Sequence, residues 1–285
     1  MIYISSSCIK KDTIAEVIKL LAENDVKNIE LSGGTRYYGG IEKDLYILKE
    51  RYGLTYACHA YFPPPEKPFV VNLASCNDEI YQRSIEHYNQ CIKMLKQIDC
   101  RVLSVHAGFM VEVGVDEIGK KLSKKIVYDE RMAYERFCRA YQYLSKQCSN
   151  SGIKLFLENN VLSSDNFNEF EHHNYMMMTD YSSIKKMREQ LDFNLLLDLG
   201  HLHVSAKTLG LNFQKECREL REYVSWMHLS ENDGIVDEHK TLIKESEIMC
   251  EFRKIYTSDM NVTLETVGDI KEILQSMQFV KISCC

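Results

Sequence analysis

Short apolar segments alternate along this chain with longer segments in which apolar residues recur every three or four positions. The short segments predict buried strands, and the longer ones predict amphipathic helices. The expected strands are Ile2–Ser5, Asn28–Leu31, Thr55–His59, Arg101–His106, Lys154–Glu158, Asn194–Asp198, Ser225–Leu229 and Asn261–Glu265. The expected helices are Ile14–Asn24, Glu42–Tyr52, Asp78–Ile98, Met132–Asn150, Ser182–Gln190, Phe213–Tyr223, Glu245–Tyr256 and Ile270–Met277.

Strict alternation of strand and helix favours a closed barrel over an open doubly wound sheet. The chain has 285 residues, which suits a barrel of this kind, since about 250 residues is its usual size. We therefore predict an α/β protein with a single (β/α)8 TIM barrel over residues 1–280 and a C-terminal tail at 281–285. Neither a Walker loop nor a G-x-G-x-x-G segment occurs in the sequence, so no nucleotide-phosphate motif is present.

Five of the expected strands end on a histidine or an acidic residue, and a sixth ends on the residue directly after a histidine. These residues are His59, His106, Glu158, Asp198, His228 and Glu265. In a parallel barrel the C-terminal ends of all strands meet at one rim, so residues far apart in the chain converge there. Imidazole nitrogens and carboxylate oxygens are ligands of Zn²⁺ and Mn²⁺. A single histidine at a strand end is usually structural, but the six together predict a metal site.

Further polar residues follow these strand ends. Two asparagines come after Glu158, and His201 stands three residues after Asp198 at a turn that we expect Gly200 to permit. After His228 the chain reads Leu-Ser-Glu-Asn-Asp-Gly-Ile-Val and then Asp237-Glu-His239. Each pattern is weak alone, and their common position at the rim gives them weight.

Net charge and cysteine content limit the binding partners and the cellular compartment that we expect for this protein. The formal net charge is −6 and the pI is about 5.9, which disfavours a general surface for nucleic acid. Eleven cysteines occur without any C-x-x-C pair, as expected for reduced thiols in a cytosolic protein. No signal peptide or membrane-spanning apolar run is evident, so we expect a cytoplasmic protein without a membrane partner. A homo-oligomer is compatible with the sequence.

With these residues in place, the chain resembles the xylose isomerase-like barrel superfamily, which contains sugar isomerases, 3-epimerases and abasic-site nucleases of the endonuclease IV type. In its epimerase-like members two glutamates, an aspartate and a histidine hold one divalent ion, and the resemblance assigns these roles to Glu158, Glu265, Asp198 and His228. Nuclease-like members hold three zinc ions with nine ligands. The matching residues are His59, His106, Glu158, Asp198, His201, His228, Asp237, His239 and Glu265.

Departures from the nuclease pattern favour the sugar enzymes. A proline-rich stretch, Tyr61–Pro68, follows His59 at the place where a nuclease-like chain enters the loop that extracts the abasic nucleotide. Ala107 and Gly108 follow His106, whereas the nuclease pattern has proline and glycine. The glycine-rich turn that the nucleases carry after their Asp-x-His is lacking after His239.

The resemblance thus implies a sugar or sugar-phosphate isomerase or epimerase that depends on one to three divalent ions, Zn, Mn, Mg or Co. Glu158 and Glu265 would transfer a proton through a metal-stabilised enediolate, and His201 would hydrogen-bond a substrate oxygen. Arg36, Asn72, Asn160 and Lys207 are the candidate substrate-binding residues. The alternative is a multinuclear zinc phosphodiesterase acting on nucleic acid at abasic sites. A barrel that binds sugar or metal without turnover is a third possibility.

Overall fold

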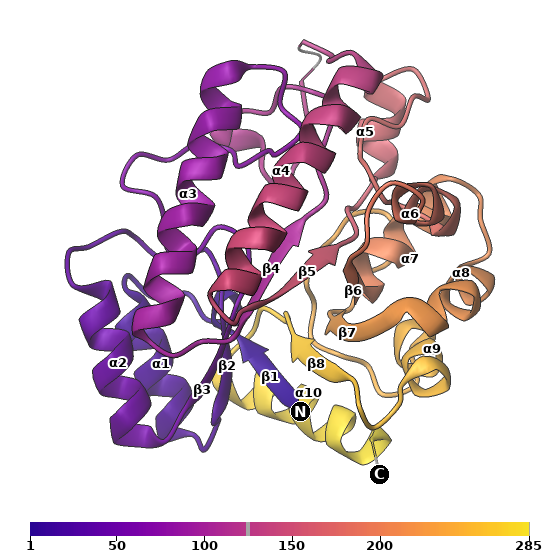
Figure 1. Cartoon of the computed structure of the whole chain (residues 1–285). Helices are drawn as coiled ribbons and strands as arrows, with labels where there is room; N and C mark the ends of the chain where they lie inside the picture. The colour runs from indigo at the N-terminus through magenta and orange to yellow at the C-terminus, as the bar shows by residue number, and fades with distance from the viewer. Residues whose placement is uncertain (124–125, 285) are drawn as a thin grey trace.

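The computed structural model describes residues 1–123 and 126–284 and shows eight parallel strands closed into one barrel, with the helices arranged around it (Figure 1). Strands pair in chain order, and β1 pairs with β8 to close the ring. The strands are β1 (Ile2–Ser5), β2 (Asn28–Leu31), β3 (Thr55–Cys58), β4 (Val102–His106), β5 (Lys154–Glu158), β6 (Asn194–Asp198), β7 (Val224–Leu229) and β8 (Asn261–Leu264). The prediction of a (β/α)8 barrel is confirmed.

Helices follow the strands around the outside of the barrel. The α-helices are α1 (Ile14–Glu23), α2 (Ile41–Tyr52), α3 (Asp78–Gln97), α4 (Glu130–Asn150), α5 (Ser164–Glu169), α6 (Tyr181–Arg188), α7 (Leu199–Thr208), α8 (Phe213–Leu220), α9 (Glu247–Ile255) and α10 (Ile270–Ser283). Three short 3-10 helices are η1 (Ser6–Cys8), η2 (Val115–Glu117) and η3 (Arg221–Tyr223). Two of these elements, α5 and α7, lie in segments where the sequence pattern predicted no helix.

Local sequence explains the outer layer. In α1, the periodic apolar residues are buried against the barrel, and Thr13 and Glu16 form a reciprocal capping box at the first turn. At the other end of the chain, α10 continues six residues beyond the predicted Met277 and ends at Ser283. Residues 281–283 of the predicted tail are therefore helical, and Cys285 lies outside the described residues.

Inside the barrel, side chains of alternate strand residues form layers. Five residues form a separate apolar cluster that fills the barrel interior; they are Tyr3, Ala57, Phe156, Leu196 and Trp226. Because successive side chains of a strand point to opposite faces, the residue two positions further along each strand also points inward. Four of these positions carry His59, Glu158, Asp198 and His228. The inward-pointing residues of these strands are thus apolar in the barrel interior and polar at the rim.

No helix in the described ranges, 1–123 and 126–284, has the length and apolarity to cross a membrane.

Candidate metal centre

The acidic and imidazole side chains at the strand ends converge on the C-terminal rim of the barrel. His106, Glu158, Asp198 and His228 lie at or near the ends of β4, β5, β6 and β7, while His59 and Glu265 directly follow β3 and β8. Glu158, Asp198 and His228 are fully buried, and His59 and Glu265 nearly so. Only His106 presents a substantial part of its side chain, 28 %, to solvent. The six residues thus form the floor of the barrel mouth.

Four of these residues make the most compact donor group. One ligand atom from each of Glu158, Asp198, His228 and Glu265 lies within 4.8 Å of the others. The Nδ1 atom of His228 is 3.2 Å from Glu158 Oε1 and 3.4 Å from Glu265 Oε2, so the two glutamates approach the same imidazole edge. Residues separated by more than one hundred positions in the chain are therefore adjacent here.

A second donor group shares Glu158 with the first. His59 Nε2 and His106 Nδ1 lie 3.3 and 3.4 Å from Glu158 Oε2, and the three residues satisfy the same distance limit as the first group. The two Nε2 atoms of His59 and His106 are 3.1 Å apart. Glu158 stands between the groups and offers one oxygen to each.

The remaining predicted ligands form a third set at the edge of the mouth. Asp237 Oδ2 is 3.2 Å from His201 Nε2 and 2.9 Å from His239 Nε2. His201 also connects this set to the first group, because its Nδ1 atom is 3.8 Å from Glu158 Oε1. The structure thus brings all nine residues selected as metal ligands into one continuous network.

Several buried polar atoms of this network have no hydrogen-bond partner among residues 1–123 and 126–284. They include both carboxylate oxygens of Glu158, Oδ2 of Asp198 and Nδ1 of His228. Leaving ionisable atoms buried without a partner is costly in free energy, and a cation would satisfy them together. Their mixed nitrogen and oxygen donors suit Zn²⁺ or Mn²⁺. The residues present therefore fit a divalent ion.

Mutual charge interactions shift the pKa values of these groups. Burial alone would raise the pKa of Glu158, but the imidazoles of His106, His59 and His228 outweigh it and hold that pKa well below its usual value. The pKa of Glu265 is lowered in the same way, chiefly by His228 against the effect of burial. Both glutamates are therefore ionised at neutral pH.

Asp198 behaves differently. Burial, reinforced by the nearby charges of Asp237 and Glu158, raises the pKa of its carboxyl group to about 6, although His201 acts in the opposite direction. For His106, burial lowers the pKa to about 4, so its imidazole is neutral at pH 7 and available as a ligand.

Asp198 is also fixed in place by the helix that follows it. Its Oδ1 atom accepts a hydrogen bond of 2.7 Å from the backbone N–H of His201 and caps α7, which leaves Oδ2 facing the donor groups. The expectation that Gly200 permits a turn is wrong, because Gly200 lies inside α7. A Cβ atom there would come within 2.7 Å of Ser230 Oγ, so glycine allows close packing of the helix against the end of β7.

Asn159, the first residue after Glu158, orients both Asp198 and His201. Its side chain accepts a 2.7 Å hydrogen bond from the Asp198 backbone N–H and donates to the Asp198 carbonyl. Its own carbonyl lies 2.9 Å from His201 Nδ1. The Asn159 contacts thereby direct the Nε2 atom of His201 toward Asp237.

Of the four residues selected as substrate-binding candidates, Arg36 lines the large cavity above the donor groups, whereas Asn72, Asn160 and Lys207 are not among its lining residues. Arg36 is exposed and pairs with Asp12. Asn72 donates to the Phe109 carbonyl and accepts from the backbone of Ala74. The Asn160 side chain donates to three backbone carbonyls, of Ala107, Gly108 and Met177. Lys207 donates to the Asp233 carbonyl at 3.2 Å.

The cavity above the donor groups has a volume of about 820 Å³. His59, His106, His201, His239 and Glu265 form its polar floor. Its walls come from rim loops and are largely apolar, with contributions from Tyr37, Tyr61, Pro64, Pro65, Phe69, Val115, Ile118 and Val267. The proline-rich stretch is therefore a wall of this cavity.

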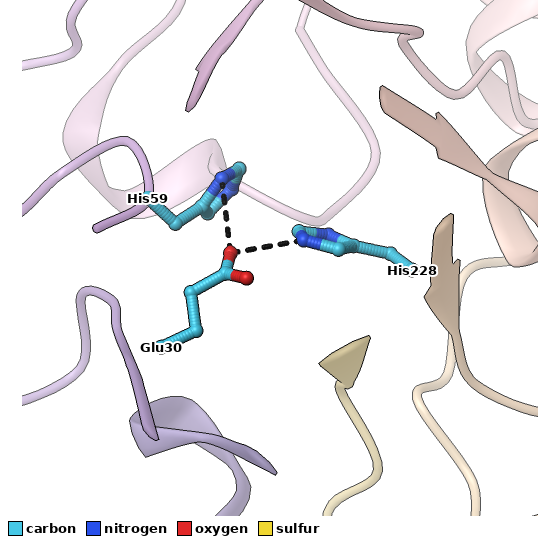
Figure 2. A group of neighbouring side chains, drawn as sticks. All are labelled: Glu30, His59 and His228. Carbon is cyan, nitrogen blue, oxygen red and sulfur yellow. Dashed lines mark hydrogen bonds and ion pairs between the residues drawn. The ribbon is translucent and has the colours of Figure 1, made fainter. Parts of the chain in front are cut away.

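One residue of the site was not anticipated from the sequence. Glu30 lies in the middle of β2, is 1 % exposed, and forms a further group of possible metal ligands with His59 and His228 (Figure 2). Glu30 precedes the last residue of its strand, so it is not one of the residues on which the expected strands end. A charged residue between the two apolar residues Ile29 and Leu31 of this strand was the available signal.

Comparison with solved structures shows the same fold at low sequence identity. A D-tagatose 3-epimerase-like protein is 18 % identical with a TM-score of 0.72, over 99 % of this chain and 96 % of that one. D-Psicose 3-epimerase from Clostridium cellulolyticum is 15 % identical with a TM-score of 0.66, over 99 % and 97 %. Endonuclease IV from Thermus thermophilus is 14 % identical with a TM-score of 0.61, over 99 % and 98 %.

No curated protein matches the sequence. The family described as xylose isomerase-like TIM barrel matches residues 11–281, which is nearly the whole chain, and its members are enzymes that include epimerases, isomerases and abasic-site endonucleases. The predicted superfamily is confirmed: this chain belongs to the xylose isomerase-like TIM barrel family.

Proposed function

We propose that this protein is a divalent-metal-dependent isomerase or epimerase of a sugar or sugar phosphate. The observation that carries the proposal is the compact group of Glu158, Asp198, His228 and Glu265, whose buried ligand atoms lie within 4.8 Å of one another at the floor of a cavity. This group joins a cation-binding set to two carboxylates that are held ionised. Such a combination suits proton removal beside a carbonyl.

Glu158, Asp198, His228 and Glu265 would hold the ion, which can be Zn, Mn, Mg or Co. When bound, the ion supplies Lewis-acid polarisation of a substrate carbonyl. Glu265 lines the cavity and, with its lowered pKa, accepts a proton from the sugar carbon. In an isomerisation Glu265 would give the same proton back to the neighbouring carbon, whereas an epimerisation would require Glu158 to take up a proton from solvent before it returns one. His201, which also lines the cavity, would hydrogen-bond a substrate oxygen.

The walls of the cavity support a small ligand rather than a duplex. Among the described lining residues, Arg36 is the only lysine or arginine, and it is already paired with Asp12. Proteins that bind a nucleic-acid backbone use several such cations to contact phosphates. Aromatic and proline side chains, by contrast, can pack against the apolar face of a sugar ring. The net charge of −6 agrees with this choice.

A phosphodiesterase acting at abasic sites is the second candidate, and one observation favours it. The groups built on His59 with His106, and on Asp237 with His201 and His239, add donors beyond those that one ion needs. Two or three zinc ions in such a site could activate water and stabilise a leaving oxygen.

Solvent-deuterium exchange tests the proposal. The protein loaded with Mn²⁺ or Co²⁺ is incubated in D₂O with a panel of ketoses and ketose phosphates, and deuterium at the exchanged carbon is followed by NMR. We expect exchange with at least one sugar, and a Glu265→Gln variant should lose at least about 1,000-fold of that rate, because the amide cannot accept the proton. The control is Glu216→Gln, which alters a buried glutamate on α8 outside the site.

Metal content completes the experiment. About one ion per chain together with sugar exchange supports the isomerase. Nearly three ions per chain, cleavage of abasic-site duplex at low enzyme concentration and no exchange across the panel would replace it with the nuclease. Normal exchange by Glu265→Gln would remove the assigned base.

A further inference from the structure

Glu30 lies behind the donor groups, on the side of the imidazoles that faces away from the other ligands. In Figure 2 its carboxylate points up between His59 and His228, which approach it from opposite sides. Its Oε1 atom is 2.9 Å from His228 Nε2 and 3.7 Å from His59 Nδ1. The other ring nitrogen of each histidine faces Glu158, at 3.2 Å from His228 Nδ1 and 3.3 Å from His59 Nε2.

The directions of the hydrogen bonds around Glu30 follow from a residue that can only donate. The indole Nε1–H of Trp226 donates to Thr263 Oγ1 at 2.9 Å, so Thr263 is the acceptor there. The Thr263 hydroxyl in turn donates to Glu30 Oε2. Both oxygens of the Glu30 carboxylate therefore accept, and the bond at Oε1 requires a hydrogen on His228 Nε2.

Hydrogen bonds around His59 place its hydrogen on Nδ1, whereas that of His228 is on Nε2. The Ser104 hydroxyl donates to the Cys58 carbonyl at 3.4 Å and lies 2.8 Å from His59 Nδ1. With its hydrogen used in this way, Ser104 accepts from Nδ1–H. The nearby Glu30 carboxylate favours the same placement of that hydrogen. The Nε2 lone pair of His59 is then left toward Glu158 and His106.

We propose that Glu30 is a positioning residue that fixes the tautomers of both imidazoles, so that His228 presents Nδ1 and His59 presents Nε2 to bound metal. Metal-bound histidines commonly donate their other N–H to a carboxylate, which sets the ring orientation and raises ligand basicity. Here one buried carboxylate serves two rings that belong to different donor groups. The inference rests on the metal binding of the proposed function and does not depend on the sugar reaction.

Metal affinity and spectra of purified full-length protein test this role without any substrate. Co²⁺ is titrated into metal-free wild type and Glu30→Gln in competition with a chelator, and the visible d–d bands report coordination. The amide has one acceptor oxygen, so it cannot accept from both Thr263 and His228. We expect Co²⁺ affinity to fall by about 10- to 100-fold with altered d–d bands, which is the range for outer partners of metal ligands.

Glu251→Gln is the matched control, because it makes the same substitution at another buried glutamate, on α9 and outside this network. Its Co²⁺ affinity should stay within about threefold of wild type. Equal weakening in both variants, or wild-type affinity and spectra in a folded Glu30→Gln protein, would overturn the proposal. Thermal unfolding of the metal-free variants establishes that they are folded.

A measurement on wild type alone covers the case in which Glu30→Gln does not fold. Long-range ¹H–¹⁵N NMR of the zinc-loaded protein identifies which ring nitrogen of His228 carries hydrogen. We expect hydrogen on Nε2 and zinc on Nδ1, and the reverse assignment would refute the role of Glu30. Failure of wild type to bind Co²⁺ or Zn²⁺ would instead refute the metal centre itself.

Discussion

The barrel interior contains an apolar layer and a polar layer, which lie two residues apart along the same strands. The lower layer contains Phe156, Leu196 and Trp226 in a closed apolar cluster, and the upper layer contains Glu158, Asp198 and His228 two positions later on β5, β6 and β7. Both layers are buried. The lower one is satisfied by packing, whereas the upper one leaves polar atoms without partners among the described residues. On each of these strands, one inward-pointing residue contributes to stability and the next one contributes to the candidate metal site.

Glu158→Gln should produce the largest effect, because Glu158 belongs to both compact donor groups. Outer partners of metal ligands already change affinity by about 10- to 100-fold, so loss of this shared ligand should weaken metal binding by more than about 100-fold. Isothermal titration with Zn²⁺ or Mn²⁺ measures this. Glu251→Gln, on buried Glu251 of α9, is the control for loss of a carboxylate elsewhere. Wild-type affinity in Glu158→Gln would contradict the assignment of the upper layer.

Phe156→Ala tests the lower layer on the same strand. Truncating a buried phenylalanine leaves a cavity, and we expect the free energy of unfolding to fall by about 3–5 kcal/mol. Denaturant unfolding measures the loss, and metal affinity of the folded protein should stay within a few-fold of wild type. A large fall in metal affinity with little change in unfolding would show that the two layers are not separate.

His87 provides a smaller test, because it is a buried imidazole outside the upper layer. Burial lowers its pKa to about 4, whereas the carboxylates around His228 raise the pKa of that ring despite burial. The unfolded chain binds a proton at His87 near pH 6.5, so its contribution favours the folded state above that pH and is lost as pH falls toward 4.

Replacing His87 by leucine removes this dependence. Between pH 7 and pH 5, wild type should lose about 2 kcal/mol more unfolding free energy than His87→Leu. Urea unfolding of both proteins at the two pH values measures these free energies. The contributions of the other titrating groups are the same in both proteins and cancel when the two losses are subtracted. Parallel losses in the two proteins would contradict a neutral buried His87.

The barrel and the meeting of its strand ends were predictable, because period-two and period-3.6 patterns alternate clearly and parallel strands bring their C-terminal ends to one rim. Helix α7 was missed because Leu199–Ala206 is buried on every side, and its polar residues alternate with apolar ones instead of recurring with helical period. The bonding of Asn72 and Asn160 to backbone carbonyls depends on loops that meet only in the folded chain. Glu30 required knowledge of strand register as well as strand ends.

The candidate metal site is completed only when the last strand of the barrel has been synthesised. Glu265 directly follows β8, whose pairing with β1 joins the last strand to the first. A chain emerging from the ribosome therefore has an open sheet and an incomplete four-residue donor group until β8 and Glu265 have been translated. The strand that closes the sheet is followed directly by the last carboxylate. A product that ends before β8 therefore has neither the closed barrel nor the full donor group.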